Sequence, residues 1–293
     1  MMIPLVSVCI PVYNGGNCIG NTLNSVLGQT IDNIEVIIVD DNSTDNTESI
    51  VKSFNDTRIK YIKNEKNIGM VANWNKARSY AAGKYIKLLC MDDLISEDCL
   101  ELQAAALEDN PTAVLVTSNT NIIGEDGKLH FVRKNFKKEG LYNGHSVGRD
   151  SLIKAKNLFG EPSVVMFRKD LSFLIGQYDS NFWYVPDWDH SLRLLKHGDL
   201  YYIDKALASF RLSTTSQTSK IINKNKQKLF EEDNLFLNKF KNQYNLNRFN
   251  LIEHYTRNII RTMAKAFYLK YVMKYINLRK EYNESSSIKQ TIN

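Results

Sequence analysis

The chain has 293 residues, of which 43% are hydrophobic and 24% charged, the composition of a soluble globular protein with a sizeable core. At about 150 residues per domain, this length suits one large domain or one domain with an appendage. No apolar run approaches the ~18 residues that a membrane-spanning helix needs. The sequence therefore predicts no membrane-spanning helix.

The positive charge of the chain is concentrated in its last quarter. Residues 220–293 hold 15 Lys and Arg against 6 Asp and Glu, a net charge of +9. The whole chain has a net charge of +6, so residues 1–219 carry −3. A mildly acidic body followed by a basic tail predicts two parts with different partners.

The cysteines and the N-terminus bear on the cellular compartment. Cys9, Cys18, Cys90 and Cys99 show no CxxC spacing. This usage is typical of small buried hydrophobes in a reducing compartment and argues against a metal–thiolate site. The first predicted strand starts a few residues after Met1, so we expect no signal peptide. These features predict a cytoplasmic protein.

The first 110 residues alternate between buried strands and amphipathic helices. Strands are predicted over 5–13, 34–39, 59–62 and 85–91. The predicted helices are 18–29, a segment capped by Ser43 or Thr44, 70–82 with Gly83 at its end, and a segment capped by Ser96 that stops at Pro111. Near-continuous apolar strands are typical of parallel sheets covered on both faces. Four strand–helix units therefore predict a Rossmann-like α/β fold, with a mainly parallel sheet and helices on both faces.

The pattern is less regular after residue 110. A strand is predicted over 113–123, and Asp126-Gly127 is typical of a hairpin turn. Residues 133–150 are polar and basic and predict a surface loop, and a further strand is predicted over 200–212. From residue 221 onward the composition favours helix, and residues 256–280 place apolar side chains at helical spacing among Arg and Lys. We therefore predict a helical extension after the sheet.

Polar residues follow three of the predicted strands: Tyr13-Asn14, Asp40-Asp41 and Asp92-Asp93. Parallel strands end at one edge of the sheet, where ligands gather in open α/β folds. Adjacent carboxylates repel each other, and a divalent cation such as Mg²⁺ or Mn²⁺ relieves that repulsion. Neither GxGxxG nor GxxxxGK[ST] occurs, so NAD-type and P-loop binding are disfavoured. A diphosphate held through a metal is the expected ligand.

Five ordered motifs resemble the family 2 glycosyltransferases of the GT-A fold: SVCIPVYNG, VIIVDDNSTDNT, the segment from Asn67 to Asn75, GKYIKLLCMDD and VPDWDHSLRL. They lie within residues 5–215. The resemblance implies a GT-A catalytic domain over 1–219, with a nucleotide-binding half over 1–110 and an acceptor half over 111–219. The basic helical extension would then cover 220–293.

The resemblance also implies a nucleotide site. In the family, the end of the first strand and the VDD segment hold the base. Tyr13 would therefore stack on uracil or thymine, and Asp40 or Asp41 would accept the N–H of the base. The full set of nucleotide-binding residues implied in this way is Pro11, Val12, Tyr13, Asp40, Asp41, Asn67, Gly69, Asn75, Asp92 and Arg211.

The metal motif of the family maps onto Asp92 and Asp93, with Mn²⁺ or Mg²⁺ as the cofactor. Its commoner form carries another Asp where this chain has Cys90, and some relatives have a His in place of Ser213. These departures imply fewer protein ligands for the metal than in the commoner form of the motif. They leave open which of Asp92 and Asp93 is the direct ligand. Arg211 would meet the leaving diphosphate, since a guanidinium suits phosphate geometry, or would form an ordinary surface ion pair.

For the acceptor half, the resemblance implies Asp187 as the catalytic base. An inverting transfer needs one carboxylate that faces the acceptor hydroxyl, opposite the leaving diphosphate. Asp189 stays open as an alternative base or as a structural residue. His190 is expected to be a satisfied residue on the surface of a helix.

The resulting hypothesis is an inverting, metal-dependent glycosyltransferase. It would move a sugar from a UDP- or dTDP-sugar to a hydroxyl of a growing bacterial surface glycan, such as lipopolysaccharide or capsule, free or lipid-linked. A catalytically weak or dead sugar-nucleotide scaffold is an alternative that Cys90 and Ser213 favour. A sugar nucleotidyltransferase is a second alternative, but the loop after the first strand lacks the Arg that such enzymes use.

The basic tail has two possible partners. A basic amphipathic helix is typical of a peripheral protein on an anionic membrane, here the inner face of the cell membrane. The same helix could instead pack against the catalytic domain or against a second subunit in a homodimer. No nucleic-acid partner is expected.

Overall fold

The computed structural model describes residues 3–212 and 226–267, which belong to two compact units. One unit comprises Met1–Ser151 and Asn157–Leu212, and the other comprises Leu152–Lys156 and Ser213–Asn293. The predicted domain boundary after residue 219 lies outside the described residues. None of the described helices is long and apolar enough to cross a membrane.

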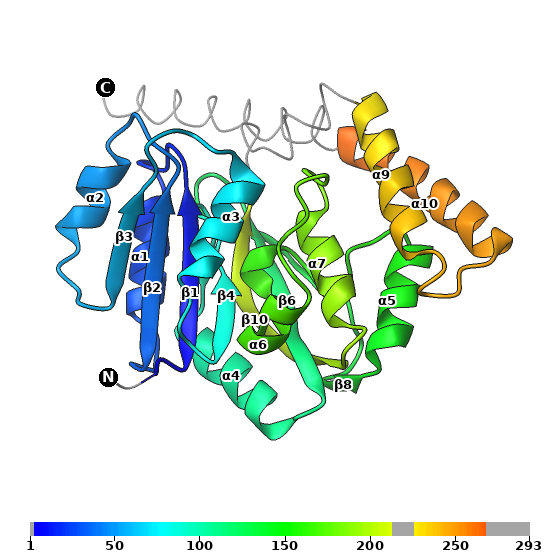
Figure 1. The fold of residues 1–293 in the computed structure, drawn as a ribbon, viewed down its shortest axis with the longest axis horizontal. Coiled ribbons are helices and arrows are strands. Elements are labelled where there is room, and N and C mark those ends of the chain that lie inside the picture. The colour runs from blue at the N-terminus through cyan, green and yellow to red at the C-terminus, as the bar shows by residue number, and fades with distance from the viewer. Residues whose placement is uncertain (1–2, 213–225, 268–293) are drawn as a thin grey trace, which may run out of the picture. The chain divides into compact units, whose positions relative to one another are not determined.

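The described part of the first unit is built on a ten-stranded sheet (Figure 1). Its strands follow the order β3-β2-β1-β4-β9-β6-β10-β5, with β7 paired to β6 and β8 paired to β10. Their bounds are β1 Val6–Val12, β2 Ile34–Asp40, β3 Ile59–Lys63, β4 Tyr85–Leu88, β5 Leu94–Ile95, β6 Ala113–Ile123, β7 Leu129–Arg133, β8 Gly140–Tyr142, β9 Met166–Arg168 and β10 Asp199–Arg211. The predicted hairpin at Asp126-Gly127 joins the antiparallel pair β6 and β7.

The strands β3, β2, β1 and β4 run parallel to one another. Every residue of β1 is buried, as expected for a strand covered on both faces. Val12 lies opposite Asp40 of β2, and Cys9 lies opposite Leu88 of β4. The segments that follow these three strands therefore meet at one edge of the sheet. The predicted α/β fold with a mainly parallel sheet is confirmed.

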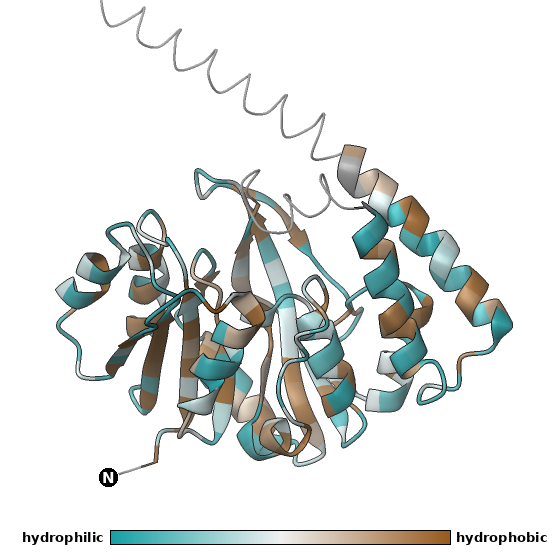
Figure 2. Ribbon diagram, turned by 45° about the horizontal axis from the view of Figure 1, so that its top comes forward, coloured by the Kyte–Doolittle hydropathy of each residue, from teal (hydrophilic) through white to brown (hydrophobic). Residues whose placement is uncertain are grey.

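Helices cover both faces of this sheet (Figure 1). Their bounds are α1 Ile19–Leu27, α2 Thr47–Ser53, α3 Met70–Ser79, α4 Cys99–Asp109, α5 Gly144–Ile153, the 3-10 helix η1 Pro162–Val164, α6 Lys169–Leu174 and α7 Pro186–Leu194. Leu23 of α1 and Leu100 of α4 belong to the core on one face, whereas Cys9 Sγ contacts Ala77 O of α3 on the other. Figure 2 shows the resulting pattern, with apolar strands between helices of mixed polarity.

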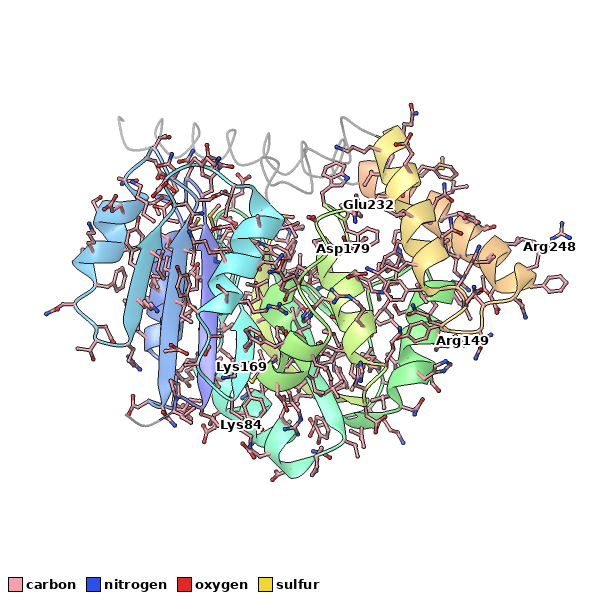
Figure 3. All side chains as sticks on the ribbon, in the orientation of Figure 1. Lys84, Arg149, Lys169, Asp179, Glu232 and Arg248 are labelled. Carbon is pink, nitrogen blue, oxygen red and sulfur yellow. The ribbon has the colours of Figure 1, made fainter. Side chains whose placement is uncertain are left out.

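The sheet is mixed because β9 runs antiparallel to both of its neighbours, β4 and β6. The backbone N–H of Lys169, just after β9, donates to the carbonyl of Lys84, just before β4, at 3.1 Å. Figure 3 accordingly shows the two lysines at the same edge of the sheet. This edge is the one opposite the carboxyl ends of β1, β2 and β4.

Two predicted boundaries around Asp92 are wrong. The strand predicted over 85–91 ends at Leu88, because the N–H of Cys90 donates to Ser163 Oγ at 3.0 Å and leaves the sheet. Ser96 does not cap the following helix. Its N–H donates to Leu207 O beside the short strand β5, and the helix begins at Cys99 with Asp98 as its N-cap.

Three further local predictions need correction. The helix predicted over 70–82 ends at Ser79, and Gly83 is required for close approach, since a Cβ there would meet the Ser7 backbone N at 2.7 Å. Ser43 and Thr44 do not cap α2, whose N-cap is Asn46. The surface loop predicted over 133–150 contains β8 and most of α5. Each error arises because tertiary contacts outweigh local turn signals.

The described part of the second unit contains the helices α9 Lys226–Phe240 and α10 Arg248–Phe267. His254 is buried, and its imidazole contacts Asp233 of α9 at 3.1 Å and the carbonyl of Leu152. The Tyr255 hydroxyl donates to Asn234 at 2.7 Å. C-terminal helices are thus confirmed, while the part of the predicted stripe beyond residue 267 lies outside the described residues.

Candidate active site

The carboxyl edge of the parallel strands is closed by loops that are bonded to one another. Asn14, in a left-handed conformation (φ 51°), receives a bond from the Thr44 N–H at 2.9 Å and donates its own N–H to Ser43 Oγ at 2.9 Å. The N–H of Gly15 donates to Thr47 Oγ1 at 2.9 Å. The loop after β1 is therefore fixed to the loop after β2, which explains the polar residues that the sequence places there.

Asp40 and Asp41 are both buried and organise the neighbouring loops. Asp40 accepts the Ser43 N–H at 2.7 Å and the Tyr61 hydroxyl at 2.6 Å. Asp41 accepts the backbone N–H groups of Ile68 and Gly69 at 2.8 and 2.9 Å. A carboxylate has about four acceptor positions, so each side chain can still receive a further donor.

The other predicted base and ribose residues lie around these two carboxylates. Pro11 and Val12 are buried at the end of β1, and Tyr13, the next residue, is 43% exposed. Asn67 Oδ1 accepts the Gly69 N–H at 3.1 Å, and Gly69 takes the positive φ of 87° that begins α3. The structure thus brings together Pro11, Val12, Tyr13, Asp40, Asp41, Asn67 and Gly69, whose role in binding a nucleotide stays a prediction.

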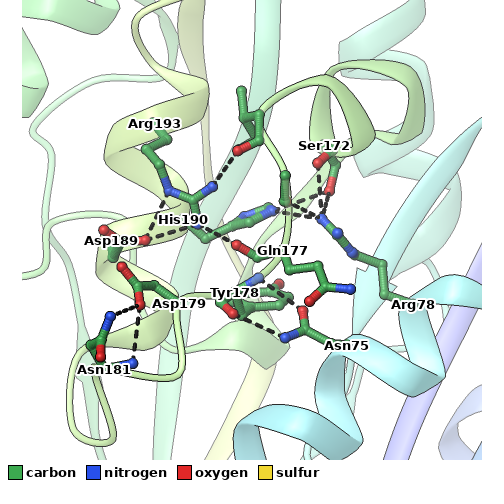
Figure 4. Close-up of polar contacts among 12 residues, drawn as sticks. Asn75, Arg78, Ser172, Gln177, Tyr178, Asp179, Asn181, Asp189, His190 and Arg193 are labelled. Atoms are coloured by element: carbon green, nitrogen blue, oxygen red, sulfur yellow. Dashed lines mark hydrogen bonds and ion pairs between the residues drawn. The ribbon is translucent and has the colours of Figure 1, made fainter.

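Asn75 has a different position from the rest of the predicted set. Its side-chain amide forms two bonds with the backbone of Tyr178, donating to the carbonyl at 2.9 Å and accepting the N–H at 2.8 Å (Figure 4). Arg78, one turn further along α3, donates to the carbonyls of Ser172 and Gly176 at 2.9 Å each. Asn75 therefore joins α3 to the segment before α7, and this contact occupies its amide.

Asp92 and Asp93 lie where β4 leaves the sheet, and both have a raised pKa. Burial raises the pKa of Asp92, while the Arg211 charge opposes the shift. Asp93 is 1% exposed, and burial together with the charge of Asp92 raises its pKa well above the ordinary value. Ser163 Oγ donates to Asp93 Oδ2 at 2.6 Å, and the Arg211 N–H donates to Oδ1 at 3.1 Å. The pair thus forms a strongly desolvated acidic site.

The donor chemistry of this acidic site fits a divalent cation. Carboxylate oxygens are hard ligands of the kind that Mg²⁺ and Mn²⁺ prefer, and a cation would relieve the repulsion of the pair. Among the described residues no group of three or more His, Cys, Asp or Glu could hold a metal ion. Asp93 already accepts one hydrogen bond on each oxygen, which makes Asp92 the better placed direct ligand.

Cys90 and Arg211 complete this side of the site. Burial raises the pKa of Cys90 well above its ordinary value, and the charges of Asp93 and Asp92 raise it further, so the thiol stays neutral where the commoner motif has an acid. The Arg211 guanidinium donates to the carbonyls of Asp92 and Gly124 at 3.0 and 3.1 Å. Arg211 is therefore anchored by backbone oxygens beside Asp92.

Asp187 is in the first turn of α7, directly after the helix-starting Pro186. Asn157 Nδ2 donates to its carboxylate at 2.8 Å. Burial, and to a lesser extent the charge of Glu161, raises the pKa of Asp187 to about 7. Asp187 lines a small hollow together with residues that include Pro162, Phe167 and Tyr178. A carboxyl with a pKa near neutrality is suited to accept a proton.

Asp189 and His190 are both buried on α7. Asp189 is fully buried and forms an ion pair with Arg193 at 2.8 Å, and Arg193 also donates to the carbonyls of Ile175 and Gln177 (Figure 4). His190 is 2% exposed and stacks on Tyr178 with ring centroids 4.3 Å apart, so its predicted place on the helix surface is wrong. Burial lowers the pKa of His190 well below its ordinary value and keeps the ring neutral.

Sequence reasoning missed Arg133 and Asn157. It noticed Glu161 and Ser163 only as part of the run from Gly160 to Arg168, which resembles the strand beneath the sugar in family 2 glycosyltransferases. Glu161 forms a two-pronged ion pair with Arg133, in which Nη1 and Oε1 are 2.7 Å apart. The charge of Glu161 raises the pKa of both Asp93 and Asp187. The run Gly160-Glu161-Pro162-Ser163 was the available signal, but its partners lie 28 to 70 residues away along the chain.

The mainly parallel sheet, with the acid pair after β4 and Asp187 on α7, resembles the GT-A fold. A sequence model of Glycosyl transferase family 2 matches residues 7–173, more than half of the chain. The chain therefore belongs to this family and is a nucleotide-sugar glycosyltransferase.

Individual relatives agree with this assignment. A glycosyltransferase of Rickettsia typhi is 31% identical over 224 residues, which are 75% of this chain and 68% of that protein. The UDP-Glc:alpha-D-GlcNAc-diphosphoundecaprenol beta-1,3-glucosyltransferase WfgD of Escherichia coli is 36% identical over 126 residues, 41% of this chain and 50% of its own. The structure of S. aureus TarS 1-349 in complex with UDP-GlcNAc matches with a TM-score of 0.70 at 21% identity, covering 91% of this chain and 76% of that one. The last likeness shows the common fold.

The raised pKa of Asp187 predicts a pH-dependent cost to stability. The pKa of Asp187 is about 7 in the folded protein and about 4 in the unfolded chain. The free energy of unfolding therefore falls as pH rises between these two values, and the full loss of stability remains above pH 7. In the presence of chelator, Asp187→Asn should therefore raise the free energy of unfolding at pH 8 by about 1–3 kcal/mol and change it little at pH 4. The measurement is the melting temperature, which should rise at pH 8 and stay nearly constant at pH 4. Equal melting temperatures of variant and wild type at pH 8 would contradict this expectation.

Proposed function

We propose that this protein is an inverting glycosyltransferase that transfers a sugar from a UDP-sugar to a hydroxyl of a growing bacterial surface glycan. The observation that carries the proposal is the pairing of the acidic site at Asp92 and Asp93 with Asp187, whose pKa is about 7. The names of two relatives support the donor, since one uses UDP-Glc and the other was crystallised with UDP-GlcNAc. The diphosphoundecaprenol acceptor of the E. coli relative favours a lipid-linked glycan.

In this proposal Asp187 is the general base. The acceptor O–H would give its proton to the Asp187 carboxylate as the oxygen forms a bond to the anomeric carbon. The bond from that carbon to the diphosphate breaks at the same time, and its electron pair leaves with the diphosphate. Asn157 would orient the base through its bond to Oδ2. A base is most effective when its pKa lies near the working pH.

The leaving diphosphate would be stabilised on the opposite side of the sugar. A cation at Asp92 would neutralise the charge that develops on the diphosphate, with Mn²⁺ or Mg²⁺ as candidates. Asp93 positions Ser163 and the backbone of Arg211 and would hold the edge of this metal site. Arg211 adds a fixed positive charge beside Asp92.

The nucleotide would lie across the ends of β1 and β2. The exposed ring of Tyr13 offers a stacking face for the base, at the place where Pro11 and Val12 end β1. Asp40 or Asp41 would accept the base N–H, and Asn67 with Gly69 would border the ribose. A non-catalytic scaffold protein would not need a raised pKa at Asp187, and this favours the enzyme over that alternative.

The role of the base is tested by Asp187→Asn, which keeps size and hydrogen bonding but removes the proton acceptor. Turnover should fall by about 10²–10⁴-fold, while UDP affinity stays within a few-fold. Asp189→Asn is the matched control, because it breaks the ion pair with Arg193 and should lower the melting temperature more than the turnover. Near-normal turnover of Asp187→Asn would show that another group is the base.

The metal site is tested by Asp92→Asn. UDP binding of the wild type should be tighter with Mn²⁺ than with chelator, because the cation links Asp92 to the diphosphate. In the variant the two affinities should converge toward the value that the wild type has in chelator. If UDP binds the wild type equally in both conditions, the metal-dependent mechanism fails.

We further propose that the second unit attaches the enzyme to an anionic lipid surface. One side of α10 exposes six large apolar side chains at helical spacing, each 55–80% accessible: Phe249, Ile252, Ile259, Ile260, Met263 and Phe267. Arg248 and Arg257 are exposed on the same helix. An apolar stripe bordered by arginines fits the boundary between acyl chains and anionic headgroups, and the net charge of +9 over residues 220–293 is complementary to it.

Vesicle sedimentation tests this attachment. The full chain should co-sediment with vesicles containing phosphatidylglycerol and be released by salt, whereas a double change of Ile260→Gln and Met263→Gln should abolish binding. Leu174→Gln of α6, which removes an equally exposed leucine from the first unit, should bind as the wild type does. Failure of the wild type to bind, with a dimer that the double change dissociates, would favour self-association.

A further inference from the structure

A small hollow lies beside the proposed base and is lined by residues of α7, β9 and the segment before α7. Its volume is about 10 Å³, close to the space that one water molecule needs. Asp187, Tyr178 and His190 line it together with apolar side chains such as that of Phe167. Asp187 and His190 are three residues apart on α7 and therefore share one face of that helix. The hollow thus adjoins a carboxylate, a phenol and an imidazole.

The contacts of His190 indicate which ring nitrogen carries its proton. Nε2 lies 3.1 Å from Ser172 Oγ and 3.4 Å from Arg78 Nη1, and Arg78 also donates to Ser172 Oγ at 2.8 Å (Figure 4). A guanidinium can only donate, so the nitrogen beside it is the acceptor. Burial lowers the pKa of His190 well below its ordinary value, so the ring is neutral and carries one proton. We therefore assign this proton to Nδ1.

Two buried polar groups at the hollow have no hydrogen-bond partner in the described part of the chain. These are Nδ1 of His190, which is 2% exposed, and the hydroxyl of Tyr178, which is 4% exposed. Both rings are held in place, since they stack with centroids 4.3 Å apart and Asn75 binds the backbone of Tyr178 on both sides. Buried polar groups nearly always bond to protein or to an ordered water. A water in the hollow would satisfy both.

The inference rests on the proposed function, in which Asp187 is the base. We propose that the hollow binds one water molecule, which accepts the Nδ1–H of His190 and the hydroxyl proton of Tyr178 and donates to the carboxylate of Asp187. Three hydrogen bonds are typical of a buried water. A hydrogen bond to the ionised form of an acid favours that form. His190 and Tyr178 are thus positioning residues that keep the base ready to accept a proton.

The other groups that face Asp187 keep their charge state near neutral pH. Glu161, which is paired with Arg133, acts on Asp187 as a negative charge that raises its pKa. Burial and the charge of Asp187 raise the pKa of the Cys90 thiol and of the Tyr178 phenol, so both stay neutral. The water is therefore the contribution that substitutions at His190 and Tyr178 would remove.

An infrared pH titration of the full chain in chelator tests the inference. The C=O band of the protonated Asp187 carboxyl is assigned by its loss in Asp187→Asn. The amide of a glutamine lies near the place of Nε2, whereas that of an asparagine lies near the place of Nδ1. His190→Gln and Tyr178→Phe should each raise the midpoint of the Asp187 titration by about 0.5–1 pH unit, because the carboxylate loses its donor.

Two variants are the matched controls. His190→Asn keeps a donor at the place of Nδ1, and Ser172→Ala removes the partner of Nε2 alone. Both should leave the Asp187 midpoint within about 0.3 pH unit of the wild type. A purely structural role would give the opposite sign, because a loosened helix start admits solvent and lowers the pKa of Asp187 toward its ordinary value.

The outcomes separate this inference from the proposed function. A midpoint that falls or stays constant in Tyr178→Phe, or in a folded His190→Gln, would overturn the inference, as would ¹⁵N chemical shifts that place the His190 proton on Nε2. The infrared titration needs neither donor nor acceptor. If the midpoint rises as expected while the acid limb of the turnover–pH profile stays in place, the water site stands and Asp187 is not the base.

Discussion

The crowding of carboxylates at one edge of the sheet is the constraint on which the rest of the site depends. Burial raises the pKa of Asp92, Asp93 and Asp187. The charge of Asp92 adds to the shift of Asp93, and the charge of Glu161 adds to the shifts of Asp93 and Asp187. An unpaired buried charge destabilises a fold by several kcal/mol. Three of the acids receive donors from distant parts of the chain: Asp93 from Ser163 and the Arg211 backbone, Glu161 from Arg133, and Asp187 from Asn157.

The surrounding structure keeps these groups in fixed positions. On the nucleotide side, Asp41 binds the backbone at the start of α3, and Asn14 links the loops after β1 and β2. On the acceptor side, Asn75 and Arg78 of α3 hold the segment before α7. The helix that borders the nucleotide loops thereby also supports the helix that carries Asp187. A site assembled on such rigid elements needs little reorganisation during the reaction.

The family model matches only part of the chain that contributes to the candidate site. The matched residues 7–173 include the nucleotide loops, the acid pair, Arg133 and Glu161, but end before Asp187 and Arg211. The proposed base, Asp187, lies on α7, and the amphipathic α10 lies in the second unit, so both come after the matched residues. The family match therefore covers the proposed nucleotide loops and the acid pair, and leaves Asp187, Arg211 and the second unit outside it.

The sequence by itself determined the parallel sheet, the polar strand ends and the acid pair, because these follow from local patterns: apolar runs with a turn at each carboxyl end. It also indicated Asp187 through resemblance to the family. Only the tertiary structure decided that Asn75 binds Tyr178, that Asp189 pairs with Arg193, and that His190 is buried. The pair of Glu161 and Arg133 joins β7 to the turn before η1, and no local pattern encodes a contact between segments that meet only when the sheet forms.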